Sequence, residues 1–169
     1  MLEGMIATRI DGKEIDLMKY SDKLVLVVNV ASQCGFTELN YRELADMHNK
    51  YRHFLDILAF PCNQFGSQEP GTATEIRKFA GTKGAKFDLF QKTNVNGPKT
   101  QPFYQRLKHA MNVTTVEWNF GKFLLAKGGR PLRYYDHRFP FEVLKRHIAA
   151  LSNMKLGKEH LESHHEEKK

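Results

Sequence analysis

The stretch Leu24-Val25-Leu26-Val27-Val28-Asn29-Val30-Ala31 is almost continuously apolar and rich in β-branched residues. This composition is typical of a strand that is covered on both faces, as in a parallel sheet. A second apolar strand, Leu55 to Phe60, ends before Pro61. Between the two strands, the residues at helical spacing on one face are Tyr41, Leu44, Ala45, His48 and Tyr51. Residues 24–60 therefore predict a β-α-β unit with a right-handed crossover.

Two hairpins are predicted on either side of this unit. Near the N-terminus, Ile6–Ile10 and Lys13–Leu17 alternate around Asp11-Gly12, a dipeptide typical of a two-residue turn. Towards the C-terminus, Phe120–Ala126 and Pro131–Tyr135 flank a glycine-containing turn.

Three further helices are predicted. Thr72-Ala73-Thr74-Glu75 has the form of a capping box and begins a helix that ends at Gly81 or Gly84. A short helix from about Pro102 to Ala110 has proline in its first turn, and the last helix follows Pro140. These elements together predict an α/β sandwich, with a central mixed sheet flanked by helices and an N-terminal β-hairpin.

The chain has 169 residues, of which 41% are hydrophobic and 27% charged, as in an ordinary globular protein. We expect one domain over residues 1–155 and a charged tail over residues 156–169. His160, His164 and His165 lie in that tail, which we interpret as a solvated extension rather than a metal site. No apolar run reaches the roughly 20 residues of a membrane span, and no signal peptide is recognised, so we expect a cytoplasmic protein.

The net charge is +7, and much of the excess lies in a basic segment, residues 121–147. Its charged residues are Lys122, Lys127, Arg130, Arg133, Arg138, Lys145 and Arg146 against Asp136 and Glu142, a local charge of 7 − 2 = +5. Such a segment attracts anions, and a non-catalytic binding module is one reading of it. Solvated faces of strands and helices are the simpler reading. No nucleic-acid-binding motif accompanies the charge, so nucleic acid is not an expected partner.

Two cysteines, Cys34 and Cys62, each follow the carboxyl end of a predicted central strand, where reactive groups gather in α/β sheets. Cys34 lies on a strand-to-helix turn, and the amide N–H groups of a following helix favour a negatively charged sulfur. A thiolate is the nucleophilic form of cysteine. The alternative is that Cys34 is a small buried apolar residue.

Three segments carry a resemblance to a known family. Asn29-Val30-Ala31-Ser32-x-Cys34-Gly35-x-Thr37 resembles the active-site segment of glutathione peroxidases. Leu58-Ala59-Phe60-Pro61-Cys62-Asn63-Gln64-Phe65-Gly66-x-Gln68-Glu69-Pro70 resembles the second signature of that family, and Trp118-Asn119-Phe120-x-Lys122-Phe123 the third. The order agrees, and the flanking sequence is similar from about residue 10 to residue 150. The resemblance implies a thioredoxin-like fold.

The resemblance also implies a catalytic tetrad of Cys34, Gln68, Trp118 and Asn119. Cys34 would be the peroxidatic residue, which is cysteine or selenocysteine in the family. The other three would donate neutral hydrogen bonds to the sulfur and to the developing oxyanion. Taken singly, Trp118 could be a core aromatic residue and Gln68 a loop cap. No metal and no prosthetic cofactor are implied, and glutathione would be a co-substrate.

The source of the reducing thiol differs among members of the family. Many cysteine-containing members have a resolving cysteine in the helix after the Gln68 loop, and are reduced by thioredoxin. Here the corresponding stretch, Ile76–Thr82, has Ala80 near that position and contains no cysteine. This indicates direct reduction by glutathione or another small thiol. The alternative is a thioredoxin-dependent peroxidase in which Cys62 is the resolving thiol.

Only nine residues separate Lys108 from Trp118, where tetrameric members of the family have an extra segment. The chain therefore resembles the short, monomeric type that reduces phospholipid hydroperoxides, and we expect a monomer that meets lipid hydroperoxides at membrane surfaces. Phe36 departs from this type, which often has lysine two residues after the peroxidatic residue. The missing resolving cysteine is also a feature of the selenocysteine branch, so Cys34 is either native or in the place of selenium.

Overall fold

Strand β3 (Leu24–Val30) occupies the centre of a five-stranded sheet, which a computed structural model describes within residues 1–152. It pairs in parallel with β4 (Leu55–Pro61) and antiparallel with β6 (Lys122–Leu125). Outside these, β5 (Asp88–Leu89) is parallel to β4 and β7 (Pro131–Tyr135) is antiparallel to β6. The predicted mixed sheet is confirmed, and the central position explains why β3 is apolar on both faces.

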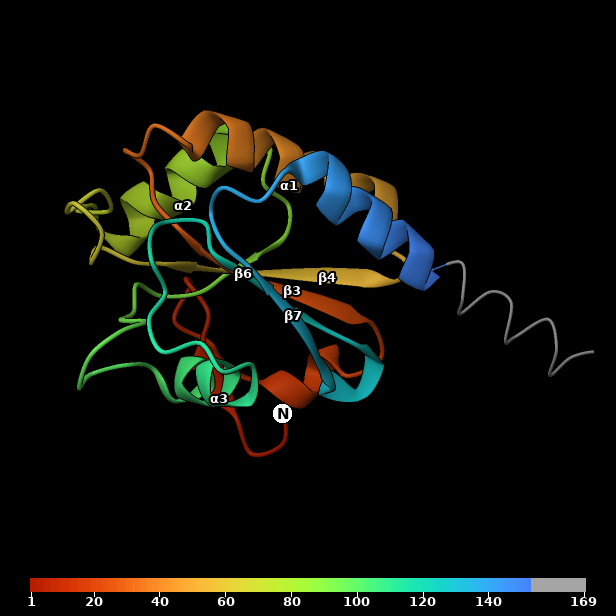
Figure 1. Ribbon diagram of the computed structural model, residues 1–169. Coiled ribbons are helices and arrows are strands. Elements are labelled where there is room, and N and C mark those ends of the chain that lie inside the picture. Colours follow the sequence, from red (N-terminus) through yellow and green to blue (C-terminus); the bar gives the residue numbers. More distant parts are fainter. Residues whose placement is uncertain (153–169) are drawn as a thin grey trace, which may run out of the picture. The chain divides into compact units, whose positions relative to one another are not determined.

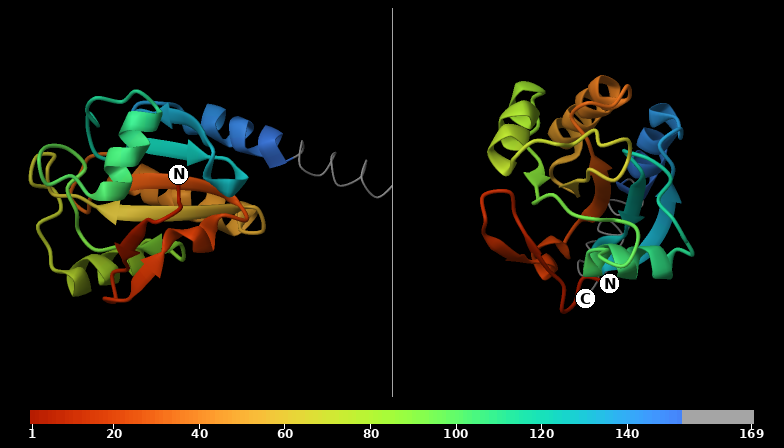
Figure 2. Two further views of the ribbon diagram at one scale, coloured as in Figure 1. Left: turned by 90° about the horizontal axis from the view of Figure 1, so that it is seen from below. Right: turned by 90° about the vertical axis from the view of Figure 1, so that its left-hand side faces the viewer.

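Helices lie on both faces of this sheet (Figures 1 and 2). Helix α1 (Thr37–Tyr51) and helix α2 (Ala73–Thr82) cover one face, and α3 (Pro102–Ala110) lies on the other. The predicted capping box of α2 is present, because Glu75 N–H donates to the Thr72 hydroxyl at 3.2 Å. Lys83 is the C-cap and Gly84, at φ +76°, follows it, so the helix continues through Gly81.

The core on the α3 side of the sheet is aromatic. Phe60 of β4 stacks on Phe90 with ring centroids 4.5 Å apart, and Tyr104 of α3 meets Phe60 edge-on at 5.4 Å. Tyr104 also contacts Phe123 of β6 at 5.9 Å. These rings hold α3 against the two strands that lead towards the candidate functional residues.

The N-terminal hairpin is present, but its turn differs from the prediction. Strand β1 (Ile6–Thr8) pairs antiparallel with β2 (Glu14–Asp16), and the 3-10 helix η1 (Leu17–Tyr20) follows. Arg9 N–H bonds to the carbonyl of Lys13, which leaves a three-residue loop instead of the two-residue turn. Gly12 adopts φ +89° at the end of this loop, the left-handed position that closes such hairpins.

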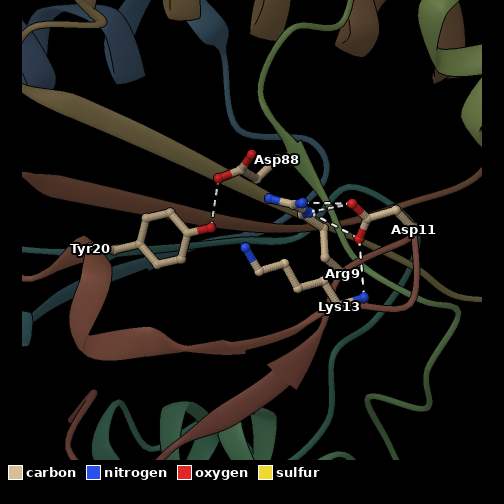
Figure 3. Close-up of polar contacts among 5 residues, drawn as sticks. All are labelled: Arg9, Asp11, Lys13, Tyr20 and Asp88. Carbon is tan, nitrogen blue, oxygen red and sulfur yellow. Dashed lines mark hydrogen bonds and ion pairs between the residues drawn. The ribbon is translucent and has the colours of Figure 1, made fainter.

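The sequence did not predict β5, which is only two residues long. Its outer edge is covered by the N-terminal hairpin, since Ile10 N–H donates to the Leu89 carbonyl and Arg9 forms a bridge with Phe90. Figure 3 shows the polar contacts beside this edge. Tyr20 donates to Asp88 at 2.6 Å, and the guanidinium of Arg9 pairs with the carboxylate of Asp11.

A second turn region and a second compact unit complete the described chain. The 3-10 helix η2 (Lys127–Gly129) joins β6 to β7, as the second predicted hairpin requires. The chain divides into Met1–Arg138 and the residues from Phe139 on. The second unit contains a helix over residues 141–152, with Leu144 and Ile148 buried, which confirms the helix predicted after Pro140. The predicted tail, residues 156–169, lies outside the described residues.

Candidate active site

Cys34 is half-buried in the loop that joins β3 to α1. The loop is closed by Thr37, whose hydroxyl accepts a hydrogen bond from Cys34 N–H at 3.0 Å and donates one to the Ala31 carbonyl at 2.7 Å. The sulfur accepts a hydrogen bond from Phe36 N–H, with the nitrogen 3.4 Å from Sγ. A backbone donor at the start of a helix is suited to stabilising negative charge on that sulfur.

Gln68 and Asn119 come from distant parts of the sequence and are in direct contact. Asn119 Nδ2 donates to Gln68 Oε1 at 2.8 Å, and Asn119 is fully buried. This bond engages the carbonyl end of the Gln68 amide, so the amide nitrogen has its donors available for another acceptor. The pair therefore provides an uncharged donor, the amide nitrogen of Gln68, whose orientation is fixed by the hydrogen bond that Gln68 Oε1 accepts from Asn119.

Three hydrogen bonds join the Cys34 loop to the Gln68 segment. Gln33 N–H donates to the Gln68 carbonyl at 3.0 Å. Ser32 donates to Glu69 Oε1 from both its backbone N–H and its hydroxyl. Glu69 is 1% exposed, and this burial raises the pKa of its carboxyl group. The segment that carries Gln68 is thus fastened to the segment that carries Cys34.

The backbone on both sides of Asn119 is fastened to β3. Asn29 Nδ2 donates to the Trp118 carbonyl at 3.1 Å, and Phe120 N–H donates to the Asn29 carbonyl at 2.6 Å. The indole of Trp118 is half-buried and packs against Phe65 with ring centroids 5.7 Å apart. Trp118 is therefore in part a core aromatic residue, as one alternative supposed.

A depression of about 450 Å³ lies beside these residues; its lining comprises Phe36, Glu117, Trp118, His137 and Arg138. Phe36 is 40% exposed and meets His137 edge-on with centroids 5.6 Å apart. The depression connects Trp118 to the Cys34 loop, because its lining also includes Phe36, whose N–H bonds to the Cys34 sulfur. No sequence motif pointed to a site role for His137 or Arg138, although both lie within the basic segment.

One pair of the predicted site residues is joined by a side-chain hydrogen bond, and Cys34 and Trp118 are connected to the site through neighbouring residues. Gln68 and Asn119 touch, the Cys34 loop is bonded to the Gln68 backbone, and Trp118 shares a depression with Phe36. Cys62 is a free thiol with no exposed surface, and burial raises its pKa. Among residues 1–152, no group of three or more His, Cys, Asp and Glu residues is placed to hold a metal ion.

Comparison with known proteins identifies the family. The family model of glutathione peroxidases matches residues 2–108. Phospholipid hydroperoxide glutathione peroxidase 1, chloroplastic, of Arabidopsis thaliana is 47% identical over 142 residues, 80% of this chain and 60% of that protein. A probable phospholipid hydroperoxide glutathione peroxidase 6, mitochondrial, of the same plant is 50% identical over 140 residues, 79% and 60% of the two chains. The chain therefore spans about three fifths of the length of these relatives.

Comparison with solved structures identifies the fold of the chain. The crystal structure of T. cruzi GPX1 matches with a TM-score of 0.73 and 28% identity, covering 89% of this chain and 95% of that one. A thioredoxin-like protein from Aeropyrum pernix matches with a TM-score of 0.64 and 18% identity, over 86% and 88% of the two chains. The expected thioredoxin-like fold is confirmed. In the described part of the chain, no helix is long and apolar enough to cross a bilayer.

Proposed function

The chain belongs to the glutathione peroxidase family, and on that premise we propose that it reduces hydrogen peroxide and organic or phospholipid hydroperoxides with glutathione as the reductant. The observation that carries this proposal is the fastening of the Cys34 loop to the Gln68–Asn119 pair at the carboxyl ends of β3 and β4. A nucleophilic sulfur beside held, uncharged donors is suited to cleaving an O–O bond.

In the oxidative step, the thiolate of Cys34 attacks one peroxide oxygen and the O–O bond breaks. An S–O bond forms, and the departing oxygen takes a proton and leaves as water or an alcohol. The product at Cys34 is a sulfenic acid, the first and reversible stage of thiol oxidation. Gln68, Trp118 and Asn119 are assigned to donate hydrogen bonds to the sulfur and to the departing oxygen, where charge develops.

In the reductive step, one glutathione thiolate attacks the sulfenic sulfur, and water leaves as a mixed disulfide forms. A second glutathione then attacks the glutathione sulfur of this disulfide, which releases glutathione disulfide and the Cys34 thiolate. Two electrons pass from two glutathiones to one hydroperoxide, so the cycle requires no metal or prosthetic group.

Cys62 bears on the choice of reductant. A resolving thiol has to reach the oxidised sulfur, but Cys62 has no exposed surface and a raised pKa, which disfavours its thiolate. The alternative, a thioredoxin-dependent enzyme with Cys62 as the resolving residue, would require the segment after β4 to open. The burial of Cys62 therefore favours a small external thiol.

Replacing Cys62 with alanine is expected to leave glutathione-dependent turnover within about twofold of wild type. The substitution removes a buried sulfur and should lower the free energy of unfolding by about 1 kcal/mol. Steady-state turnover with glutathione, glutathione reductase and NADPH measures the first effect, and thermal unfolding the second. A Cys34–Cys62 disulfide in the wild-type chain after one equivalent of peroxide would instead favour the thioredoxin-dependent alternative.

Gly66 supplies a second test, because it lies against the Gln68 amide. Its φ is +66°, and a Cβ at this position would lie 3.2 Å from Gln68 Nε2. Gly66→Ala is therefore expected to displace that amide and to slow oxidation of Cys34 by about tenfold, roughly the effect of losing one hydrogen bond. Gly12→Ala is the matched control, because Gly12 has φ +89° and a Cβ added there would meet nothing within 4 Å. Equal rates of Cys34 oxidation in the two variants would show that Gly66 does not support Gln68.

The depression beside Trp118 is the proposed contact site for the hydroperoxide. Phe36 and Trp118 offer aromatic surface to an acyl chain, and Arg138 is exposed on the same lining. We propose on this basis that the chain acts as a monomer on lipid hydroperoxides at membrane surfaces. Two free cysteines are compatible with a reducing compartment such as the cytoplasm, whereas the names of the relatives point to a chloroplast or a mitochondrion.

A non-catalytic binding module is the alternative function of another class. The basic segment supports it less than its charge suggests, since Lys122 is only 2% exposed and does not contribute to the surface. A coupled peroxidase assay separates the two functions. Turnover of hydrogen peroxide and a phospholipid hydroperoxide with glutathione supports the peroxidase. Turnover only with thioredoxin would show that thioredoxin, and not glutathione, is the reductant. Inertness towards both peroxides would refute the peroxidase.

A further inference from the structure

Lys122 is a buried lysine whose ammonium group lies between two parts of the candidate site. It belongs to β6 and is 2% exposed. Its Nζ donates to Asn40 Oδ1 of α1 at 2.9 Å and to the Phe120 carbonyl at 2.7 Å. A buried ammonium is costly unless it is hydrogen-bonded, so its presence here has to be accounted for.

The first contact leads towards Cys34. Asn40 accepts from Lys122 and at the same time donates from Nδ2 to the Phe36 carbonyl at 2.9 Å. Phe36 N–H is the donor that lies 3.4 Å from the sulfur of Cys34. Hydrogen bonds join the ammonium to Asn40 and Asn40 to the Phe36 carbonyl, and the backbone of Phe36 connects that carbonyl to its N–H. The ammonium polarises the amide of Asn40 in the direction that strengthens its bond to the Phe36 carbonyl, which fixes the position of Phe36.

The second contact leads towards Trp118 and Asn119. Phe120 directly follows Asn119 and adopts φ +67°, which is a strained conformation for a bulky side chain. Its carbonyl accepts from Lys122, and its N–H donates to the Asn29 carbonyl. The turn that presents Asn119 is therefore fixed on one side by β3 and on the other by the ammonium.

We propose that Lys122 is a positioning residue for the peroxidatic site, which holds the Phe36 donor on the Cys34 sulfur and the Trp118–Asn119 turn at the same time. This inference rests on the proposed function. Lys122 acts through the hydrogen bonds that it donates to Asn40 and Phe120.

The surroundings of Lys122 make this role dependent on pH. Burial lowers the pKa of Lys122 to about 7, and Asp136, which follows β7, acts in the opposite direction. Tyr135 is the register partner of Lys122 on β7, and Glu43 follows Asn40 by three residues on α1. Below about pH 7 the ammonium donates to both acceptors, and above it the positive charge behind the Cys34 loop is lost.

The test is Lys122→Met, a substitution that keeps length and loses the donors. The second-order rate of Cys34 oxidation by hydrogen peroxide and the rate of Cys34 alkylation by iodoacetamide are measured from pH 5.5 to 8.5, without glutathione. For Lys122→Met we expect both rates to fall about tenfold at pH 6. For wild type we expect both rates to decrease as Lys122 loses its charge above about pH 7, and this decrease should be absent from the pH profile of Lys122→Met.

Lys108→Met is the matched control. Lys108 of α3 has the same pattern of contacts, donating to the Val95 carbonyl at 2.9 Å and to Asn96 Oδ1 at 3.0 Å, and burial also lowers its pKa. The Lys108→Met substitution should change thermal stability without changing the rates of Cys34 oxidation and alkylation. Equal rates for Lys122→Met and wild type, or an equal loss in Lys108→Met, would overturn the proposal.

Asn40→Asp keeps the inference testable if Lys122→Met fails to fold. The carboxylate still accepts from Lys122 but no longer donates to the Phe36 carbonyl, so the same slow Cys34 oxidation is expected. A wild-type rate in this variant would overturn the proposal. Because these assays follow Cys34 directly, a chain that shows the Lys122 effect but has no turnover with glutathione would refute the proposed reductant and not the role of Lys122.

Discussion

Cys34→Ser is expected to lower hydroperoxide turnover by at least about a thousandfold, the largest effect of any single substitution in this chain. Serine has nearly the same size, but its hydroxyl is not ionised near neutral pH and cannot act as a soft nucleophile on oxygen. The Phe36 N–H that bonds to Sγ at 3.4 Å would still find an acceptor, so the loop should keep its conformation. The fold and the thermal stability should therefore change little.

The measurement is the coupled assay with glutathione, run on hydrogen peroxide and on a phospholipid hydroperoxide. Cys62→Ser is the control, because it removes the other thiol of the chain and should retain activity. Cys34→selenocysteine is a third variant, expected to be at least as active as the wild type, since a selenolate is the better nucleophile. Turnover by Cys34→Ser close to that of wild type would exclude Cys34 as the peroxidatic residue.

Gln68→Ala is expected to lower kcat/KM for hydrogen peroxide by about 100-fold. Removing a single donor to a developing oxyanion typically costs about 3–4 kcal/mol, and the remaining donors recover part of this loss. The substitution also leaves Asn119 Nδ2, which is buried, without its acceptor at 2.8 Å. A decrease in the free energy of unfolding of about 1–2 kcal/mol is therefore expected as well.

Single-turnover oxidation of Cys34, followed by trapping of the sulfenic acid, separates the chemical step from reduction by glutathione. Gln91→Ala is a suitable control, because Gln91 is exposed and bonds to Thr8 through its backbone N–H, which alanine retains. If Gln68→Ala oxidised as fast as Gln91→Ala, Gln68 would be a structural residue of the loop, which was the simpler reading of the sequence.

Local patterns predicted most of the elements. The apolar run at Leu24–Ala31 became the central strand, and the predicted helix from about Pro102 to Ala110 is α3 with the same ends. These elements were recognisable because their burial pattern and end signals lie within the segment itself. β5 was missed because two residues carry no periodic pattern, and its conformation depends on pairing with Leu58 and Ala59.

The candidate site divides in a similar way. The sequence suggested Cys34, Gln68, Trp118 and Asn119 through three short motifs. It did not predict that Asn119 would donate to Gln68, nor that Ser32 would bond to Glu69, because these partners are separated by 51 and 37 residues. His137 and Arg138 reach the depression beside Trp118 only because the chain returns there after β7.

The sequence by itself determined that a cysteine would follow a buried central strand, because strand composition and the turn before a helix are local properties. It also placed Lys122 in a basic segment, where it counted as a surface charge. Only the tertiary structure decided that Lys122 would be buried between Asn40 and Phe120. The antiparallel register of β6 on β3 sets Lys122 opposite Val28, and α1 covers that face, so the ammonium is enclosed by residues that no local pattern relates to it.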